Sequence, residues 1–551
     1  MNEKLRADAE AIANFLERYR SATGVADPDE AMVLPYSYTT EFYAWLCALL
    51  YTAGRGDIWF ERAASATKAA LDTLDAHTCQ RLTTLPGGNF HWEFKNMALL
   101  HVEQCIGSRF DPALHRRLQQ ALLDWQDLNI DSANWTAMRA LSYLLRGLHF
   151  KRPSDHWRSR LELTLVLGMQ TPEGLLPDTP QSRSLQYHAY TLSLLGLHYQ
   201  LSAHDHVRDA LLSGARFIAD FIDPEGDFNY FGRGQRQIFG YASLILALRA
   251  AAHCTPDHAE AARFATLAER VLGFMHRFCD ADGIFPLVLN TAGEQWGWYC
   301  YNRRGDYLAF CGVWFLLAAA YPEITPAASV DATCYLHGYP GVGLAAARGN
   351  GWFAVLSSRG DDLAEPLGLV HISPAGPTCL GGPDPERARD IDYSENYFGP
   401  LVAGQAVLQH SNGTMEVANG SVRLRFMLPE LEVEQIYRVD GGLTLEQTLT
   451  PRGRLHTVTP LVSAGYRPQS ALTLQETPGV ASPLGTISRY DGENITIDKP
   501  YTLRVELTHR DEAQACMTYT KPISANGLSI GRTLVKAIWL AWIWLTVTHQ
   551  T

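Results

Sequence analysis

A short segment, Arg183–Tyr190, carries the side-chain types that acid–base chemistry uses: a guanidinium, two phenols and an imidazole. On a helix, Arg183 and Tyr187 are four residues apart and Tyr187 and Tyr190 three apart, so these side chains lie near one face. His188 points about 100° away from that face. One helix end can therefore present a fixed cation beside groups that accept and donate protons. The alternative is an amphipathic helix whose aromatic side chains fill the core and whose arginine is solvated.

Two further segments offer groups that can bind a carboxylate. Asn134 and Trp135 belong to the run DSANW, which opens a predicted helix. Arg233 and Arg236 belong to the run GRGQRQ, a loop whose glycines allow a ligand to approach the backbone closely. An arginine can pair with a carboxylate through two parallel hydrogen bonds, so these two are predicted to bind substrate. Tyr187 and Trp135 are predicted to contact the substrate as well. The alternative for this loop is a helix cap with solvated arginines.

Two other stretches mix aromatic and basic side chains, a combination that suits an anionic sugar chain. Aromatic faces can stack on sugar rings, and arginine can bind carboxylate or sulfate. The side chains that we predict to contact such a substrate are His91 and Trp92 in the first stretch and Trp298, Tyr299 and Arg303 in the second. The alternative is a pair of core tryptophans beside a surface turn.

The run Glu173–Leu195 resembles the active-site segment of the alginate lyases with an (α/α) barrel, which have GFLP followed by R-x-L-x-Y-H-N-Y. The matching residues, in order, are Gly174, Leu176, Pro177, Arg183, Leu185, Tyr187, His188 and Tyr190, and Ala189 stands where that family has asparagine. Upstream, Asn134 matches the neutralising asparagine of the family, but Trp135 replaces the histidine that follows it there. The Asn-Trp pair is also similar to that of the chondroitin and hyaluronate lyases. The heparinase II/III-like lyases likewise join such a toroid to a β-sandwich.

This resemblance implies cleavage of a uronic-acid polymer by β-elimination, in which a base removes the proton next to the sugar carboxylate and the glycosidic oxygen leaves. Donors aimed at the carboxylate stabilise the enolate-like intermediate, and Asn134 and Arg183 are expected to fill this role. Tyr190 is expected to act first as base and then as acid, and its phenolate would need nearby cations. His188 is expected to be the auxiliary base and is the other candidate for the base itself, because an imidazole titrates near neutral pH.

The chain is expected to be an α+β protein of two domains. Residues 1–325 show apolar positions spaced by three and four, which predicts paired helices closing into an (α/α) toroid, or alternatively an open helical solenoid. After Pro322 the sequence changes: apolar and polar residues alternate, and glycine, proline and β-branched residues are frequent. Residues 326–551 are therefore predicted to form an antiparallel β-sandwich.

The whole-chain composition narrows the partners. The 46 basic and 58 acidic residues give a net charge of −12, which argues against nucleic-acid binding. The ten cysteines form no CxxC pair and are read as reduced core residues. The charged N-terminus shows no signal peptide, so a cytoplasmic location is expected, with a periplasmic or secreted one as the alternative. The apolar segment Leu534–Val547 is short for a membrane span and contains Lys536, which leaves a tail anchor as the weaker interpretation.

No metal-binding motif or cofactor motif is found, so no cofactor is expected. Some related lyases hold a structural zinc in their sheet domain, but its ligands cannot be identified in this chain. The substrate is expected to be an anionic polysaccharide or oligosaccharide. The first rival is a glycoside hydrolase on the same toroid, with Glu93, Asp131 and Asp227 as candidate carboxylic acids. The second is a carbohydrate-binding protein without activity. The polymer, endo or exo action and the oligomeric state stay open.

Overall fold

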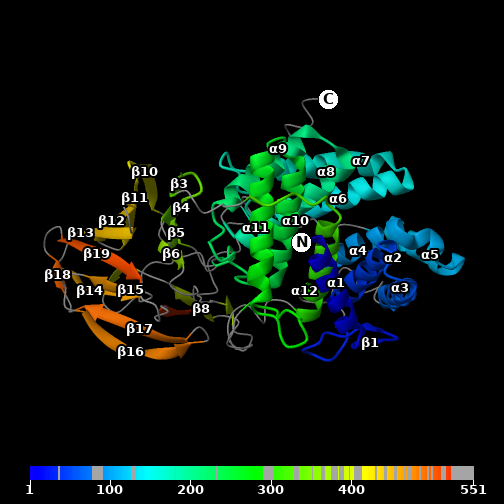
Figure 1. Ribbon diagram of the computed structural model, residues 1–551, viewed down its shortest axis with the longest axis horizontal. Helices are drawn as coiled ribbons and strands as arrows, with labels where there is room; N and C mark the ends of the chain where they lie inside the picture. Colours follow the sequence, from blue (N-terminus) through cyan, green and yellow to red (C-terminus); the bar gives the residue numbers. More distant parts are fainter. Residues whose placement is uncertain are drawn as a thin grey trace.

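A computed structural model describes most of the first 373 residues and the strand segments that follow (Figure 1). The described residues are 1–34, 37–76, 91–125, 132–179, 182–230, 232–289, 303–327, 334–349, 352–360, 367–373, 382–383, 390–395, 398–402, 413–428, 431–439, 443–451, 456–463, 466–469, 474–482, 485–492, 495–497, 501–509 and 517–522.

Six helices form a closed inner ring. They are α2 (Thr39–Thr52), α4 (Trp92–Ile106), α6 (Ala133–Phe150), α8 (Leu185–Ser202), α10 (Ile238–Cys254) and α12 (Arg304–Ala319). Each packs against the next in this order, and α12 packs back against α2. Because the last helix contacts the first, the described helices form a closed ring and not an open solenoid.

A second set of helices covers the ring from outside. It consists of α1 (Asn2–Glu17), α3 (Ile58–Ala76), α5 (Pro112–Leu123), α7 (Pro153–Gly168), α9 (Asp205–Ala219) and α11 (His258–His276). The helices α3, α5, α7, α9 and α11 each pack on the inner helix that precedes them, while α1 packs mainly on α12. Hydrogen bonds from the Asn2 backbone and side chain to Glu323 and to the Tyr321 carbonyl hold the chain start against the end of the ring.

The sequence reflects this two-layer arrangement. The inner helices α2, α8, α10 and α12 are buried along nearly their whole length, so their apolar residues run all round the helix. The outer helices are buried on one side only, as in α5, where Leu118 and Leu122 face inward. Asp111 caps the start of α5 by accepting two backbone N–H bonds, with Pro112 in the first turn.

The loops that lead from an outer to an inner helix share one turn. After α7, α9 and α11 the chain makes a tight turn whose fourth residue is Gly174, Gly226 or Gly283. These glycines have φ values of 105°, 102° and 76°, which favour a residue without a side chain. A Cβ atom at Gly226 would also lie 2.5 Å from the backbone oxygen of Arg270. The same glycine turn therefore precedes three successive inner helices, α8, α10 and α12.

The strands that follow the helices form antiparallel sheets. A four-stranded sheet has the order β3 (Tyr335–Tyr339), β4 (Leu344–Gly349), β5 (Trp352–Ser357) and β6 (Gly368–Ser373). A six-stranded sheet has the order β10 (Thr414–Ala418), β11 (Ser421–Leu428), β12 (Leu431–Val439), β13 (Leu443–Pro451), β19 (Tyr501–His509) and β15 (Tyr466–Gln469). A third has the order β16 (Leu474–Ser482), β17 (Gly485–Gly492), β14 (His456–Ser463) and β18 (Ile495–Ile497), with β9 (Phe398–Val402) also on β14. A fourth has the order β20 (Met517–Pro522), β8 (Asp390–Glu395) and β7 (Gly382–Pro383), and β1 (Arg20–Ser21) pairs with β2 (Gly24–Val25) near the chain start.

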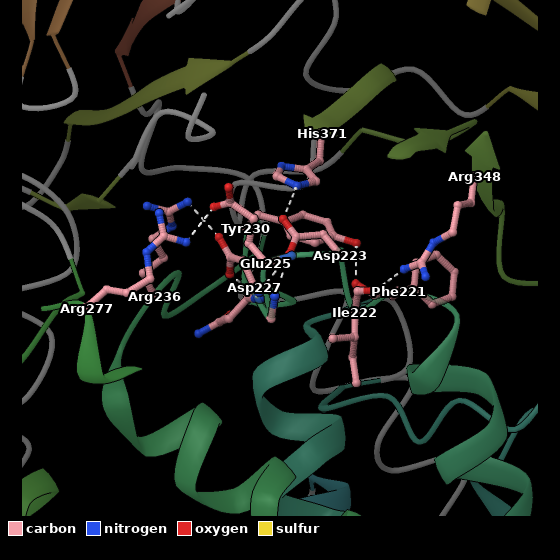
Figure 2. A network of polar contacts seen from close by, with 12 residues as sticks. Phe221, Ile222, Asp223, Glu225, Asp227, Tyr230, Arg236, Arg277, Arg348 and His371 are labelled. Atoms are coloured by element: carbon pink, nitrogen blue, oxygen red, sulfur yellow. Dashed lines mark hydrogen bonds and ion pairs between the residues drawn. The ribbon is translucent and has the colours of Figure 1, made fainter. Parts of the chain in front are cut away.

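The loop between α9 and α10 joins the helices to the four-stranded sheet (Figure 2). One carboxylate oxygen of Asp223 accepts backbone N–H bonds within the turn, and the other lies 3.1 Å from Nε2 of His371 on β6. The ring of Tyr230 stacks on His371 at 4.0 Å, and Arg348 on β4 donates to the carbonyl of Ile222. The sheet is therefore fixed to the end of the ring where the inner helices begin.

The expected boundary near residue 325 and the sandwich packing of the sheets stay predictions. Helix α12 ends at Ala319 and strand β3 begins at Tyr335. No helix among the described residues is long and apolar enough to cross a membrane. The segment Leu534–Val547 lies outside those residues.

Candidate functional site

Most of the described residues that the sequence singled out lie where the inner helices begin. His91 precedes α4, Asn134 and Trp135 are in the first turn of α6, Arg183 and Tyr187 are at the start of α8, Arg233 and Arg236 precede α10, and Arg303 precedes α12. The inner helices therefore bring these segments to one end of the ring. Trp298 and Tyr299 lie outside the described residues.

Asp178 connects three of these segments. One of its carboxylate oxygens accepts a hydrogen bond from the amide of Asn134, and the other pairs with the guanidinium of Arg233. Its backbone oxygen also accepts the N–H of Ala133 at 3.2 Å. The guanidinium of Arg233 lies over the ring of Tyr187, 4.5 Å from its centre. The amide, carboxylate, guanidinium and phenol thus form one continuous set of contacts, which we call the Asp178 cluster.

The exposure of the Asp178 cluster is uneven. Asp178 is 1% exposed and Tyr187 is 8% exposed, whereas the side chain of Arg233 is 25% exposed. Arg233 therefore brings positive charge from the cluster toward solvent. The hydroxyl of Ser184 donates to the backbone oxygen of Arg233 at 3.1 Å and so holds its loop on α8.

Tyr190 lies in the aromatic core and not beside the arginines. It is 0% exposed, and its ring stacks on Phe94 with the centroids 5.8 Å apart. Its hydroxyl contacts the sulfur of Met138 at 3.5 Å. Burial raises the pKa of the Tyr190 phenol well above its usual value, with Glu93 adding to the effect. This position does not favour the phenolate that the expected base role requires.

His188 makes hydrogen bonds to the backbone through both ring nitrogens. Nδ1 accepts the N–H of Leu176 at 3.0 Å, and Nε2 lies 3.1 Å from the carbonyl of Gly214. Burial lowers the pKa of His188 to about 4, so the ring is neutral at pH 7. The imidazole thus links α8 to the backbone at Leu176 and Gly214. Both of its nitrogens are engaged there, which does not favour the expected role of auxiliary base.

Arg183 joins the ring to the sheet. Its guanidinium donates to the hydroxyl of Ser357 at 2.9 Å, to the carbonyl of Arg359 at 2.8 Å and to the carbonyl of Gly343 at 3.3 Å. The side chain is buried. The motif resemblance implies that this arginine binds the substrate carboxylate. In the structure its hydrogen bonds instead connect the start of α8 to the β4–β5 hairpin.

Arg236 is buried in an ion pair. It lies 2.6 Å from a carboxylate oxygen of Asp227, whose other oxygen accepts the hydroxyl of Tyr241. Arg236 has a φ of 54°, an uncommon backbone conformation for a residue with a side chain. Figure 2 shows this pair beside the loop that meets the sheet. The predicted contact of Arg236 with substrate therefore competes with a buried carboxylate.

The remaining predicted contacts are partly exposed. His91 packs edge-on against Tyr38, and Trp135 packs edge-on against Phe94. Trp92 and Trp135 are intermediate in exposure. Arg303 lies 3.3 Å from the carboxylate of Glu30.

The carboxylic acids of the hydrolase interpretation are separated and engaged. Glu93 is buried and lies 3.6 Å from Arg139. Asp227 binds Arg236 and Tyr241, as described above. Asp131 lies outside the described residues. Among the described residues, Glu93 and Asp227 therefore belong to two separate ion pairs, and no contact brings them together as a catalytic pair.

Asp178 and Asp306 are among the buried carboxylates at this end of the ring that sequence reasoning missed. Asp178 stands in an irregular loop, where no periodic pattern marks it. Asp306 in the first turn of α12 accepts bonds from Ser37, the Tyr38 backbone and Thr39, and burial raises its pKa to about 6. An acid in the first turn of a helix is a recognisable capping signal, but its partners come from a distant part of the chain.

No group of three or more histidine, cysteine, aspartate or glutamate side chains among the described residues could hold a metal ion. His371 on β6 faces Asp223, with its Nε2 3.1 Å from a carboxylate oxygen.

No protein-family model matches the chain, and no curated protein matches it. Among solved structures, it is similar to the chondroitin AC lyase of Streptomyces coelicolor A3 in complex with chondroitin sulphate, at 15% identity and a TM-score of 0.49, over 93% of this chain and 80% of that one. It is also similar to an α-1,6-mannanase of Salegentibacter, at 11% identity and a TM-score of 0.43, over 57% of this chain and 99% of that one. A family 88 glycosyl hydrolase of Bacteroides vulgatus has 10% identity and a TM-score of 0.40, over 58% and 98%. These values assign neither a family nor an activity to this chain.

Proposed function

We propose that this chain is a carbohydrate-active enzyme that binds an anionic polysaccharide or oligosaccharide where its inner helices begin, and cleaves it by β-elimination at a uronic acid. The observation that carries the proposal is the Asp178 cluster. It brings the amide of Asn134, the guanidinium of Arg233 and the phenol of Tyr187 into one set of contacts. These are the group types that the reaction needs around one sugar acid.

The first requirement is to make the proton next to the sugar carboxylate removable. Hydrogen-bond donors that hold the carboxylate lower the energy of the enolate-like intermediate, and a preorganised donor of this kind contributes about 3–4 kcal/mol. In the proposal, Arg233 and Asn134 supply these donors. Arg233 replaces Arg183 in this role, because Arg183 already donates to three oxygens of the sheet and its hairpins.

The second requirement is a base that can return its proton to the leaving oxygen. Tyr187 suits this role better than Tyr190, because the guanidinium of Arg233 lies over its ring and its side chain is 8% exposed, whereas Tyr190 is 0% exposed. A neighbouring cation stabilises a phenolate, and the guanidinium of Arg233 lies directly over the ring. The same hydroxyl can take the proton and then donate it to the departing glycosidic oxygen.

The third requirement is a surface for the sugar rings. Trp135 follows Asn134 directly, and Trp92 begins the neighbouring inner helix. Both indoles are partly exposed, so each can present an aromatic face to a sugar.

The test is a substrate screen with the full-length chain. Alginate, glucuronan, chondroitin and a bacterial exopolysaccharide are compared with neutral mannan, reading ultraviolet absorbance of the new conjugated double bond and, separately, new reducing ends. A lyase raises both signals on a uronic-acid polymer and neither on mannan. Reducing ends without absorbance would identify a hydrolase, and binding without either signal would identify a carbohydrate-binding protein.

A matched pair of variants ties the activity to the cluster. Arg233→Met removes the guanidinium but keeps the length of the side chain, and we expect it to lower kcat/KM about 100-fold or more. Arg216→Met is the control, because Arg216 is an exposed arginine that pairs with Glu260 on the outside of the ring. Equal activity in the two variants would contradict the assignment of Arg233.

A further inference from the structure

Asp178 occupies an unusual position for a buried acid. One of its carboxylate oxygens accepts a hydrogen bond from Asn134 in the first turn of α6. The other pairs with Arg233, in the loop before α10. The residue itself precedes α8 and is also held by the N–H of Ala133. One side chain thereby fixes three of the inner-helix entries relative to one another.

This arrangement restricts how both donors can point. A carboxylate accepts hydrogen bonds only, so it selects the NH₂ side of the Asn134 amide. The second hydrogen of that NH₂ group then has a defined direction in the amide plane. The guanidinium of Arg233 is planar and rigid, so anchoring one of its nitrogens to Asp178 also sets the plane that lies over Tyr187.

We infer that Asp178 is the positioning residue of the proposed lyase site: it orients the carboxylate-binding amide of Asn134 and guanidinium of Arg233 without contacting the substrate. This inference rests on the proposed function. Because a misplacement of about 1 Å can cost on the order of 100-fold in rate, loss of the anchor lowers kcat while the aromatic contacts keep KM nearly unchanged.

The competing interpretation is that Asp178 only stabilises the fold. The chain offers a matched control, because Asp155 forms a buried pair with Arg146 through bonds of 2.7 and 2.9 Å between α6 and α7. Asp155 has the same chemistry but no contact with the Asp178 cluster. A purely structural role predicts the same outcome for Asp178→Asn and Asp155→Asn.

The experiment compares the full-length wild type, Asp178→Asn and Asp155→Asn, with circular dichroism to establish that each is folded at the assay temperature. The first reading is kcat and KM on the uronic-acid polymer that the wild type cleaves. The second is the rate at which phenylglyoxal modifies Arg233, followed by peptide mass spectrometry without any substrate. If Asp178→Asn does not fold, Asp178→Glu, which keeps the charge but displaces it, is measured in its place.

We expect Asp178→Asn to lower kcat about 100-fold with KM changed less than about threefold, and to speed the modification of Arg233. Asp155→Asn is expected to leave both readings at the wild-type values. An unchanged modification rate in Asp178→Asn, or an equal fall of kcat in both variants, overturns the inference. A wild type that cleaves no polymer overturns the proposed function instead, and the modification rates still decide whether Asp178 holds Arg233.

Discussion

Two tyrosines three residues apart on α8 allow a direct test of where the chemistry takes place. Tyr187 lies under Arg233 in the Asp178 cluster, whereas Tyr190 lies among the rings of the core. Replacing each separately by phenylalanine removes one hydroxyl and leaves the ring in place. The motif resemblance implies Tyr190 as the reacting tyrosine, whereas the proposed function uses Tyr187.

The structure sets the size of both effects. The hydroxyl of Tyr190 contacts a thioether sulfur, which is a weak acceptor, so Tyr190→Phe is expected to change the free energy of unfolding by at most about 1 kcal/mol. Its activity is expected to stay within about threefold of the wild type. Loss of a positioned acid–base group costs about 10² to 10⁴ in rate, so Tyr187→Phe is expected to lower kcat by at least about 100-fold.

The assay is the initial rate of ultraviolet absorbance on the polymer that the wild type cleaves, with urea unfolding of both variants as the check on stability. The fold must survive in Tyr187→Phe for its rate to be interpreted, which the unfolding curve establishes. The reverse pattern, an active Tyr187→Phe and an inactive but folded Tyr190→Phe, would refute the placement argued above and return the reaction to Tyr190.

Three further outcomes follow from the buried contacts. Arg183→Met removes the bonds to Ser357 and its neighbours, so we expect faster hydrogen exchange in β4 and β5 by mass spectrometry, with the helices unchanged. Asp227→Ala leaves Arg236 buried without its carboxylate and is expected to cost about 3–5 kcal/mol in urea unfolding. Burial lowers the pKa of His188 to about 4, while an unfolded histidine titrates near 6.5. Acidification from about pH 6.5 to about pH 4 therefore favours the unfolded chain, by about 3 kcal/mol in all, and His188→Gln is expected to flatten this dependence.

Much of the helical half follows from local signals in the sequence. Apolar residues at spacings of three and four predict helices, and the glycine turns at Gly174 and Gly226 predict where the helices are interrupted. Closure of the ring does not follow from such signals. It depends on α12 packing back against α2, and in the outer layer on α1 packing against α12, between segments that no local pattern connects.

The motif draws attention to the start of α8 but does not tell how its side chains are placed. Arg183 precedes α8 and contacts the sheet, whereas Tyr187 and Tyr190 are three residues apart within the helix, near one face. Helical spacing does not tell whether that face meets solvent or the core. Tyr190 is about one turn deeper than Tyr187, and its ring stacks on Phe94 in the aromatic core, whereas the ring of Tyr187 lies under Arg233. Asp178 itself stands in a loop, where no periodicity applies.

The arginines at this end of the ring show why residue type alone overestimates the charge that a substrate meets. Arg183 is used to hold the sheet and Arg236 to neutralise Asp227, and both are buried. Arg233 keeps a quarter of its side chain exposed, although it too has a carboxylate partner. Among these three motif arginines, Arg233 is therefore the one with the most exposed positive charge, and it lies over Tyr187. In the proposed function, binding strength then comes largely from aromatic faces such as Trp135, while Arg233 selects which sugar of the chain is placed beside the phenol.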